Sequence, residues 1–295
     1  MAHVNGGNKI SPRSSAPVTA RIRGLLGRLT PSEEAVARVV LGSANEVLNI
    51  SVEALAERAQ VSTATVMRLT QALGFSGFKE FKIALAMERG SNPPAALSEE
   101  LTPGDSPLEI VRKVIRSEVT ALNETSELLE EESLQAAIDA LAKARNIDIY
   151  GMGSSAPVVV DAYYRFLRIG LRVSTPPDSH MQAVNAALLR PGDVAFIVSH
   201  TGETKEVNKT AAKAREMGAT VIALTSYFRS PLLKHAHIHL VAATSETTSR
   251  VEAMASRTAH LAIIDSLYVA LAMRNADASG EALSKTQAAI DEQRK

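Results

Sequence analysis

The chain has 295 residues, 45% of them hydrophobic, and its 32 Lys and Arg balance its 32 Asp and Glu. This length suggests about two domains, each with an ordinary packed core. The absence of cysteine excludes disulfides and thiolate chemistry. No stretch matches a secretory signal or the ~20 apolar residues of a bilayer span. We therefore expect a soluble, cytoplasmic protein.

Charge is distributed unevenly along the chain. Residues 1–90 carry 11 basic and 7 acidic side chains, residues 91–132 carry 3 and 10, and residues 133–295 carry 18 and 15. A basic front, an acidic middle and a mildly basic rear indicate separate functions for these segments. Residues 1–17 are rich in Gly, Ser and Asn, and we expect them to be disordered.

Residues 18–90 have the pattern of a small all-α domain. After a helical stretch near 18–29, Thr30, Pro31 and Glu33 form a typical helix start. Two short helices separated by a tight turn follow, and a further helix covers 78–90. Two helices joined in this way, with a third in front, are typical of a helix-turn-helix domain.

The second helix of such a pair begins after Ser62 and ends at Gly74. In a DNA reader its first residues lie in the major groove, where hydroxyls and arginine contact bases or phosphates. We therefore expect a palindromic DNA operator as partner, with Arg21, Arg23 and Arg28 adding to the basic surface. The alternative is a helical dimerisation domain with solvated polar positions. The predicted DNA-binding residues are Ser62, Thr63, Thr65, Arg68, Lys79 and Lys82.

The rear of the chain predicts an α/β domain at 108–277, after a Pro-rich linker at 91–107 and before a polar tail at 278–295. Two helices lead into it, and short β-branched strands then alternate with helices. This alternation indicates a parallel sheet with helices on both faces. The predicted helices include 108–129, 133–144, one from Ala156 and one at 250–274; the strands are 146–150, 194–198, 220–224 and 238–242.

Two strand ends carry matching polar sequences, "GMGSS" at 151–155 and "SHTGET" at 199–204. Ligands of open α/β sheets lie beyond the carboxyl ends of the strands. Glycines let the backbone approach a ligand, and a following helix offers unpaired N–H groups to an anion. The set suits a phosphate monoester, and also fits a neutral polyol. The alternative, without any ligand site, is that these serines and threonines only cap helices.

Known cofactor motifs are missing. "GMGSSA" lacks the third glycine of the dinucleotide fingerprint, and no Walker loop is present. His235, His237 and His239 share a strand-like spacing, but the sequence shows no evident fourth metal ligand. We therefore expect neither a cofactor nor a metal.

Taken together, these motifs resemble a known family. "GMGSS" and "SHTGET" resemble the sugar isomerase (SIS) domain, with its flavodoxin-like fold and an S-x-S-G-x-T phosphate loop. "VSTATVMRLTQALGFSGFKEFK" is similar to the helix-turn-helix of RpiR-type bacterial regulators, and "EAMASRTAHLAIIDSLYVAL" to the helix late in their SIS domain. The resemblance implies a transcription factor that senses a phosphorylated sugar or sugar acid and forms dimers or tetramers through its SIS domain.

By position, the resemblance places Ser155 near the sugar and the hydroxyls of Ser199, Thr201 and Thr204 at the phosphate. Thr201 stands where the usual residue is serine, and His200 fills a variable position. Beside them, the residues themselves suggest Ser154, Gly202 and Glu246 as part of the ligand site.

The SIS fold also serves aldose–ketose isomerases, which need a base and an acid. The available candidates are Glu246, Glu252, His180, His200 and His260. His260 lies in an apolar helix, where packing is its more ordinary role. Because an isomerase has no evident need for a DNA reader, we predict a regulator without enzymatic activity. We prefer repression relieved by the ligand.

Overall fold

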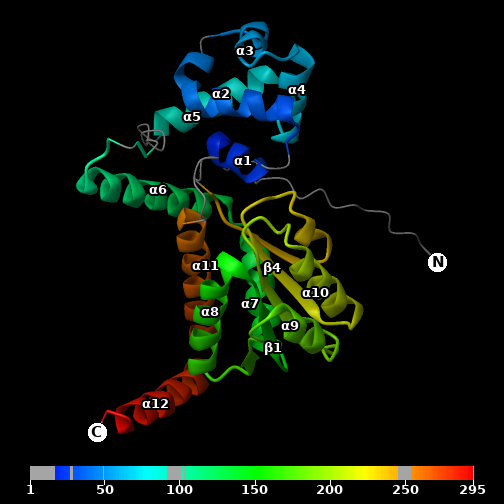
Figure 1. Cartoon of the computed structure of the whole chain (residues 1–295), viewed down its shortest axis with the longest axis vertical. Helices are drawn as coiled ribbons and strands as arrows, with labels where there is room; N and C mark the ends of the chain where they lie inside the picture. Colours follow the sequence, from blue (N-terminus) through cyan, green and yellow to red (C-terminus); the bar gives the residue numbers. More distant parts are fainter. Residues whose placement is uncertain are drawn as a thin grey trace, which may run out of the picture. The chain divides into compact units, whose positions relative to one another are not determined.

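The computed structural model describes residues 17–26, 29–48, 50–91, 101–102, 104–244 and 254–294 (Figure 1). The chain divides into two compact units, Met1–Leu97 and Ser98–Lys295. Every helix in the described ranges is too short or too polar to cross a membrane.

The first unit is helical, as its pattern predicts. Thr30 and Glu33 form a reciprocal capping box, in which each side chain accepts the backbone N–H of the other. Ser51 and Ser62 cap the next two helices through their hydroxyls. The described helices are α1 (Val18–Leu25), α2 (Pro31–Val47), α3 (Val52–Arg58), α4 (Thr63–Ala72) and α5 (Phe78–Ser91).

Helices α3 and α4 form the helix-turn-helix pair. The turn between them contains Gln60 with a φ of 53°, and α4 ends before Gly74 with a φ of 84°. Apolar side chains at helical spacing, among them Leu55, Val66 and Leu69, are buried against the remaining helices. The local cap signals and the apolar spacing therefore agree on one packed unit.

Our expectation that Arg21 extends the basic surface is wrong. Arg21 is buried, with its guanidinium carbon 4.0 Å from the centroid of the Phe75 ring. Burial lowers the pKa of Arg21, and it also lowers the pKa of Arg23, to about 10. These arginines pack within the unit, and Arg28 lies outside the described residues.

The second unit contains a parallel five-stranded sheet with the order β2-β1-β3-β4-β5. This is the flavodoxin-like order, and it confirms the predicted fold class. The strands are β1 (Ile147–Tyr150), β2 (Val173–Ser174), β3 (Val194–Val198), β4 (Thr220–Thr225) and β5 (Ile238–Val241).

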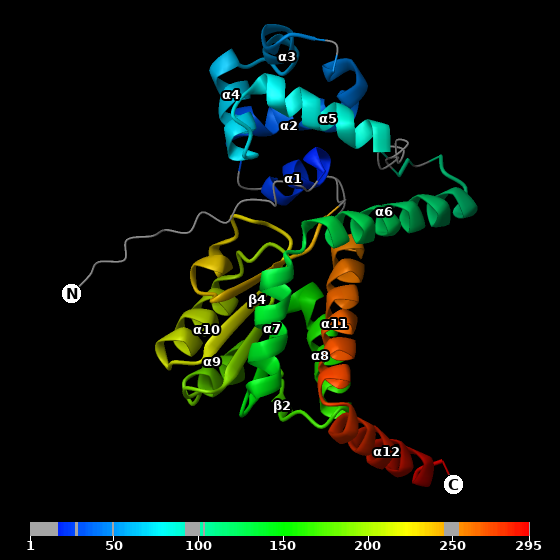
Figure 2. The ribbon, with the colours of Figure 1, turned by 180° about the vertical axis from the view of Figure 1, so that it is seen from behind.

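Helices cover both faces of the sheet (Figures 1 and 2). Helices α7, α8 and α11 share one core with alternate strand residues such as Ile149, Phe196 and Leu224. Helices α9 and α10 lie on the opposite face. The helices of this unit are α6 (Pro107–Leu128), α7 (Glu131–Lys143), α8 (Ala156–Arg168), α9 (Ser179–Ala186), α10 (Lys205–Glu216), α11 (Met254–Arg274) and α12 (Ala276–Glu292).

Three elements differ from the sequence-based expectation. The two-residue strand β2 and the short helix α9 are absent from it, because neither is long enough to show a period. The C-terminal segment, expected as a frayed polar tail, forms helix α12. Its Ala, Glu, Gln and Lys residues are strong helix formers, and Leu283 packs against the core of the second unit.

Candidate functional sites

Helix α4 has one solvent-facing side, which runs from its N-terminus to its last turn. Ser62, Thr63, Arg68 and Gln71 are exposed on it or just before it. Gln71 follows Arg68 by three residues and therefore lies on the same side of the helix. Gln71 is not among the predicted residues, although its spacing from Arg68 and its polarity can be read from the sequence, and glutamine can bond adenine.

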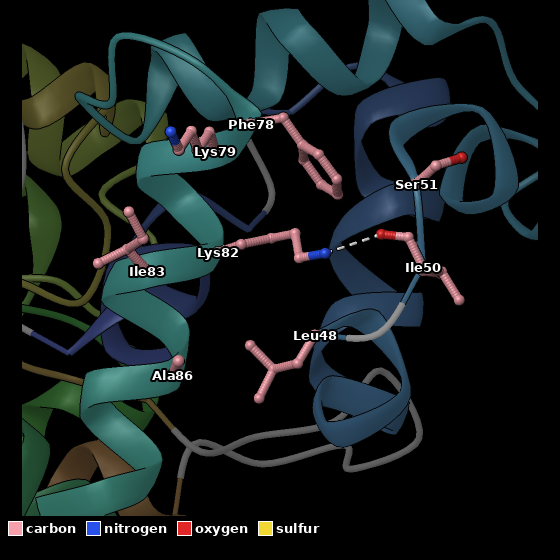
Figure 3. A pocket seen from close by; sticks show the side chains of 8 residues that line it. All are labelled: Leu48, Ile50, Ser51, Phe78, Lys79, Lys82, Ile83 and Ala86. Atoms are coloured by element: carbon pink, nitrogen blue, oxygen red, sulfur yellow. Dashed lines mark hydrogen bonds between the residues drawn. The ribbon is translucent and has the colours of Figure 1, made fainter.

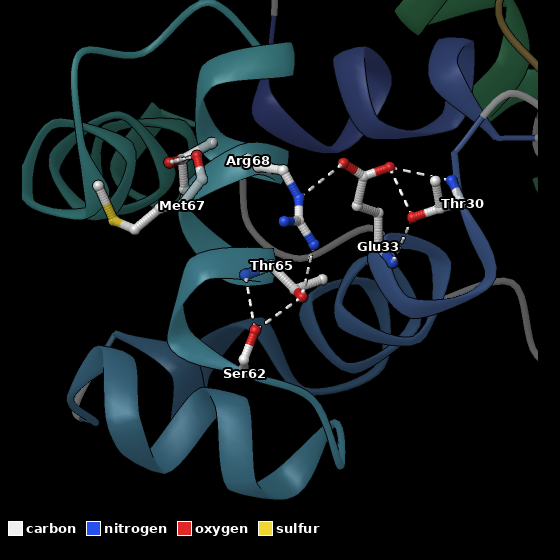
Figure 4. Close-up of polar contacts among 7 residues, drawn as sticks. Thr30, Glu33, Ser62, Thr65, Met67 and Arg68 are labelled. Atoms are coloured by element: carbon white, nitrogen blue, oxygen red, sulfur yellow. Dashed lines mark hydrogen bonds and ion pairs between the residues drawn. The ribbon is translucent and has the colours of Figure 1, made fainter.

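A small polar network orients Arg68 (Figure 4). Its Nη2 donates to Oγ1 of Thr65 at 2.9 Å, and its Nε lies 3.9 Å from a carboxylate oxygen of Glu33. The Thr65 hydroxyl also lies 3.1 Å from Oγ of Ser62. Thr65 is 3% exposed, whereas the Arg68 side chain is 60% exposed. Thr65 therefore positions the arginine, and of these two residues Arg68 is the one that offers its polar group to a partner.

The two expected phosphate contacts on α5 differ in their surroundings (Figure 3). Lys79 is exposed, but Nζ of Lys82 donates to the backbone carbonyl of Ile50 at 3.0 Å. Lys82 thus ties α5 to the segment before α3. Both lysines border an open groove of about 440 Å³ whose lining is Leu48, Ile50, Ser51, Phe78, Lys79, Lys82, Ile83 and Ala86.

In the second unit, the two polar sequences meet at one edge of the sheet. Tyr150 of β1 pairs in parallel with Ile197 of β3, so the segments after these strands leave the sheet side by side. From β1 the chain crosses to β2 on one side, and from β3 it continues to β4 on the other side, which makes the β1–β3 pair the switch point of the topology. Open α/β sheets bind ligands at this position.

The first loop follows β1 and requires glycine at two places. A Cβ on Gly151 would lie 2.7 Å from the Val159 side chain and 2.8 Å from the Val198 carbonyl. Gly153 has a φ of 58°, which a side chain disfavours. The loop leads through a short 3₁₀ turn to α8, with Ser155 buried at the N-cap position.

A residue that the sequence analysis missed supports this first loop. Gln182 of α9 is buried, and its Nε2 donates to the carbonyls of Gly151 at 3.1 Å and Pro176 at 3.3 Å. Its position two residues after His180, near the start of an unpredicted helix, gave no signal in the sequence.

The second loop follows β3 and is folded by its own hydroxyls. Oγ of Ser199 accepts the N–H of Gly202 at 3.2 Å, and Oγ1 of Thr201 accepts the N–H of Glu203 at 3.2 Å. Gly202 has a φ of 62°, and a Cβ there would overlap the Ser230 hydroxyl. The loop is therefore a tight turn that only glycine permits at its centre.

Asn208 of α10 completes this turn and was also missed. Its side-chain amide donates to the carbonyls of Gly202 at 2.8 Å and Thr204 at 2.9 Å. An asparagine one helical turn after Thr204 is the sequence signal that could have identified it.

Unused hydrogen-bond donors gather around the two loops. Within the described part of the chain, no side chain caps the N-terminus of α8 or α10, whereas Asp178 caps α9. Hydroxyls that accept a backbone N–H keep their own hydrogen for another acceptor. The loop hydroxyls with no protein acceptor among the described residues are those of Ser154, Ser155, Ser199, Thr201 and Thr204. Such a set suits an anion with several acceptor oxygens.

The remaining predicted ligand residues fall in two classes. Glu246 lies outside the described residues, as does Glu252. His200 lies in the second loop, with its Nδ1 3.0 Å from Oγ of Ser226.

The histidines near β5 are not assembled as a metal site. Nδ1 of His237 accepts the N–H of Val221 at 3.0 Å, which fixes its ring against β4. Across the described ranges, no group of three or more His, Cys, Asp or Glu side chains is arranged to hold a metal ion.

Comparison with known proteins gives two family matches. Residues 17–92 match the model of a helix-turn-helix domain of the rpiR family, and residues 140–270 match the SIS domain. The two models thus cover the helical unit and the sheet with its loops.

Individual proteins are similar over nearly the whole chain. An uncharacterised HTH-type transcriptional regulator of Caldanaerobacter subterraneus is 37% identical, covering 87% of this chain and 91% of that protein. An uncharacterised HTH-type transcriptional regulator of Haemophilus influenzae is 33% identical, covering 95% of this chain and 98% of that protein. The Vibrio vulnificus NanR protein, whose structure was solved in complex with ManNAc-6P, is 28% identical in sequence. The match covers 94% of this chain and 98% of that chain, with a TM-score of 0.60.

Proposed function

Because this chain belongs to the rpiR family of helix-turn-helix transcriptional regulators and carries an SIS domain, we propose that a phosphorylated sugar controls its binding to DNA. The sugar phosphate binds at the carboxyl edge of β1 and β3, and α4 reads the operator. Repression relieved by the effector is the mode we favour.

The observation that supports effector binding most directly is the set of unused donors at one edge. Two loops on neighbouring strands bring five hydroxyls and two uncapped helix N-termini together. A hydrogen bond to a charged group contributes about 1.5–3 kcal/mol, so three or four of them support micromolar-scale binding after the cost of immobilising the ligand. The similarity to a protein complexed with ManNAc-6P supports a phosphorylated amino sugar as the first candidate.

On the DNA side, we assign base contact to Arg68 and Gln71 and backbone contact to Ser62, Thr63 and Lys79. Arginine can bond guanine through two N–H groups, and hydroxyls and lysine suit phosphates. Two expected residues receive different roles. Thr65 positions Arg68, and Lys82 reaches DNA only if it leaves the Ile50 carbonyl.

A palindromic operator requires at least a dimer, and α6 offers a surface for one. Val111, Ile115 and Val119 are 48–53% exposed at successive turns of this helix. In an antiparallel pair of α6 helices centred on Ile115, Arg112 of one copy faces Glu118 of the other. Apolar spacing with flanking opposite charges is typical of helix pairing. We propose a homodimer or a dimer of dimers built through this surface.

An isomerase remains the second candidate for the SIS domain, and one observation weakens it. His260 is 2% exposed, and burial, assisted by the charge of His200, lowers its pKa to about 3. A base so enclosed cannot reach a substrate carbon.

A thermal-shift screen tests the proposed function. N-acetylmannosamine 6-phosphate, glucosamine 6-phosphate, N-acetylmuramic acid 6-phosphate and 2-keto-3-deoxy-6-phosphogluconate are compared with their unphosphorylated forms. The true effector raises Tm by an amount that grows with the logarithm of its concentration relative to Kd, and it changes operator affinity in a gel-shift assay. Stabilisation by none of the phosphorylated compounds contradicts the proposal. Aldose–ketose interconversion above about one turnover per second, within the usual range for enzymes, selects the isomerase instead.

A further inference from the structure

A buried arginine lies against the turn that joins α4 to α5. Arg21 belongs to α1 and is 2% exposed, although its side chain carries a charge. Its guanidinium carbon lies 4.0 Å from the centroid of the Phe75 ring. A cation over an aromatic face at this distance is favourable, and more so where water is excluded. Arg21 therefore packs on the first residues after α4 and does not face solvent.

The same guanidinium fills the space beside Gly74, where α4 has just ended. Gly74 has a φ of 84°, and a Cβ there would lie 2.9 Å from Nη2 of Arg21. The turn is closed by two backbone bonds, from Gly74 to the carbonyl of Gln71 at 2.9 Å and from Phe75 to that of Thr70 at 3.0 Å. The C-terminal end of a helix carries a partial negative charge that a cation stabilises. Arg21 thus suits both the shape and the charge of this helix end.

The turn is also held from the side of α5. The N–H and the hydroxyl of Ser76 donate to one carboxylate oxygen of Glu80, at 2.7 and 2.6 Å. The Phe75 ring packs edge-on against Phe81 of α5, with centroids 5.7 Å apart. Burial lowers the pKa of Arg21, and the charge of Glu80 raises it in part. Arg21, Phe75 and Glu80 therefore act on one another at the junction of α4 and α5.

Helix α1 gives this arginine a fixed support. Thr19, in its first turn, donates its N–H to Glu88 of α5 at 3.3 Å, and the Thr19 hydroxyl bonds the same carboxylate. Ile22 and Leu25 of α1 are no more than 1% exposed. Because α1 is packed and bonded in this way, Arg21 holds the turn at a constant place relative to α5.

We propose that Arg21 is a positioning residue for operator reading, which fixes the turn between the base-contacting side of α4 and Lys79 of α5. This inference rests on the proposed binding of DNA by α4. Arg68 and Gln71 lie before the turn, and Lys79 lies after it. Phosphate contacts set the register in which a base is read, so base and phosphate contacts form together only when the turn keeps one geometry.

Binding of two DNA duplexes by the full-length protein, followed by fluorescence anisotropy, tests this role. The first duplex is one that the wild type selects from random-sequence DNA, and the second is a scrambled duplex of the same composition. Arg21→Met should lower affinity for the selected duplex about tenfold, within the range of one bidentate base contact. Affinity for the scrambled duplex should change less than about twofold, because the surface charges of α4 and α5 remain.

Ile22→Val is the matched control for lost stability. Ile22 is fully buried next to Arg21 in the same helix, and removing one methyl group leaves a small cavity. This variant should lower Tm and keep the wild-type ratio of the two affinities. An equal fall of that ratio in Ile22→Val, or a wild-type ratio in folded Arg21→Met, overturns the inference. If Arg21→Met does not fold, Arg21→Lys, which loses the planar contact with Phe75, is judged by the same ratio.

Salt dependence separates positioning from direct contact with DNA. Each phosphate contact contributes about 0.9 to the slope of log affinity against log salt concentration. On the scrambled duplex, Arg21→Met should keep the wild-type slope. A slope smaller by about one shows that Arg21 itself reaches a phosphate, and it overturns the inference. If the wild type enriches no sequence from the random pool, the proposed function itself fails.

Discussion

Glu33 and Arg68 lie against each other on the surface of the helix-turn-helix unit, with Oε1 of the carboxylate 3.9 Å from Nε of the guanidinium. The same carboxylate accepts the N–H of Thr30 and so caps α2. One side chain thus links the start of α2 to the recognition side of α4. An arginine held in this way loses less rotamer entropy when it binds a base.

Arg68→Ala is therefore expected to reduce operator affinity by about 5- to 150-fold, which corresponds to the 1–3 kcal/mol of a bidentate base contact. Fluorescence anisotropy with labelled operator measures the change. Arg38→Ala removes an equally charged residue that pairs with Glu34 on α2 and serves as the control. The effector-induced rise in Tm should be the same in both variants. Equal loss of DNA and effector binding by folded Arg68→Ala contradicts the division of labour between the units.

Replacing the hydroxyls of the second loop should abolish the effector response. In the double variant Ser199→Ala, Thr201→Val, two donors to the phosphate are lost and two loop N–H groups lose their acceptors. Loss of two such bonds weakens effector binding by at least about 100-fold. Operator binding without effector should remain at the wild-type level. A gel-shift titration with an unchanged midpoint for effector release places the ligand elsewhere.

Gly202→Ala should disrupt the same loop through its backbone. Its φ is 62°, and the added Cβ overlaps the Ser230 hydroxyl, so the turn must open. Effector affinity should fall more than tenfold. Gly192→Ala is the matched control, because Gly192 has a φ of 90° but no atom within 4 Å of the added Cβ. Both variants carry a left-handed strain of about 1–2 kcal/mol, so only Gly202→Ala should affect binding in calorimetric titrations. If effector affinity falls by a similar factor in both variants, backbone strain alone explains the loss.

Much of the fold could be predicted because the signals are local. Thr30 with Glu33, and Ser51 and Ser62, mark helix starts through the hydrogen bonds that the structure contains. Four of the five strands show as short apolar runs, and their alternation with helices predicts a parallel sheet. Elements without a period, such as β2, escaped prediction.

The site is less accessible to sequence reasoning, because its support comes from distant segments. Gln182 of α9 supports the first loop through hydrogen bonds. Ser226, directly after β4, lies within hydrogen-bonding distance of His200 and His260. The burial of Arg21 against Phe75 is likewise a tertiary contact that the charge count cannot reveal. The two loop motifs, in contrast, could be found in the sequence, because each is a short pattern directly after a predicted strand. The pairing of β1 with β3 then brings the two loops together in the fold.

The exposed apolar side of α6 predicts the assembly state. Ile115 is 53% exposed, and Ile115→Lys places two like charges face to face in the proposed helix pair. We expect a monomer in light scattering and a loss of operator affinity, because two half-sites can no longer be bound together. Glu216→Gln, exposed at the end of α10, raises the net charge by the same one unit and is the control. Both variants should remain folded, and only Ile115→Lys should lose the stability that dimerisation contributes. A dimeric Ile115→Lys protein excludes α6 as the interface.

The buried His260 predicts how stability depends on pH. Its pKa is about 3 in the folded protein, because of burial and then the charge of His200, against about 6.5 in an unfolded chain. Between these values the unfolded state binds more protons, so the free energy of unfolding is highest above pH 6.5 and falls on acidification, by up to about 1.4 kcal/mol per pH unit.

The histidine contribution can be isolated by substitution. Urea unfolding followed by tyrosine fluorescence reports the second unit alone, because all 5 tyrosines lie there. His260→Gln removes the titrating group but keeps a hydrogen-bonding side chain for Ser226, so it should reduce the slope between pH 6.5 and 4.5 by about one proton. The comparison uses slopes, since the substitution also changes stability at every pH. An unaltered slope would show that His260 is protonated with equal ease in the folded and unfolded states, and that its enclosure by α11 and β4 does not persist in solution.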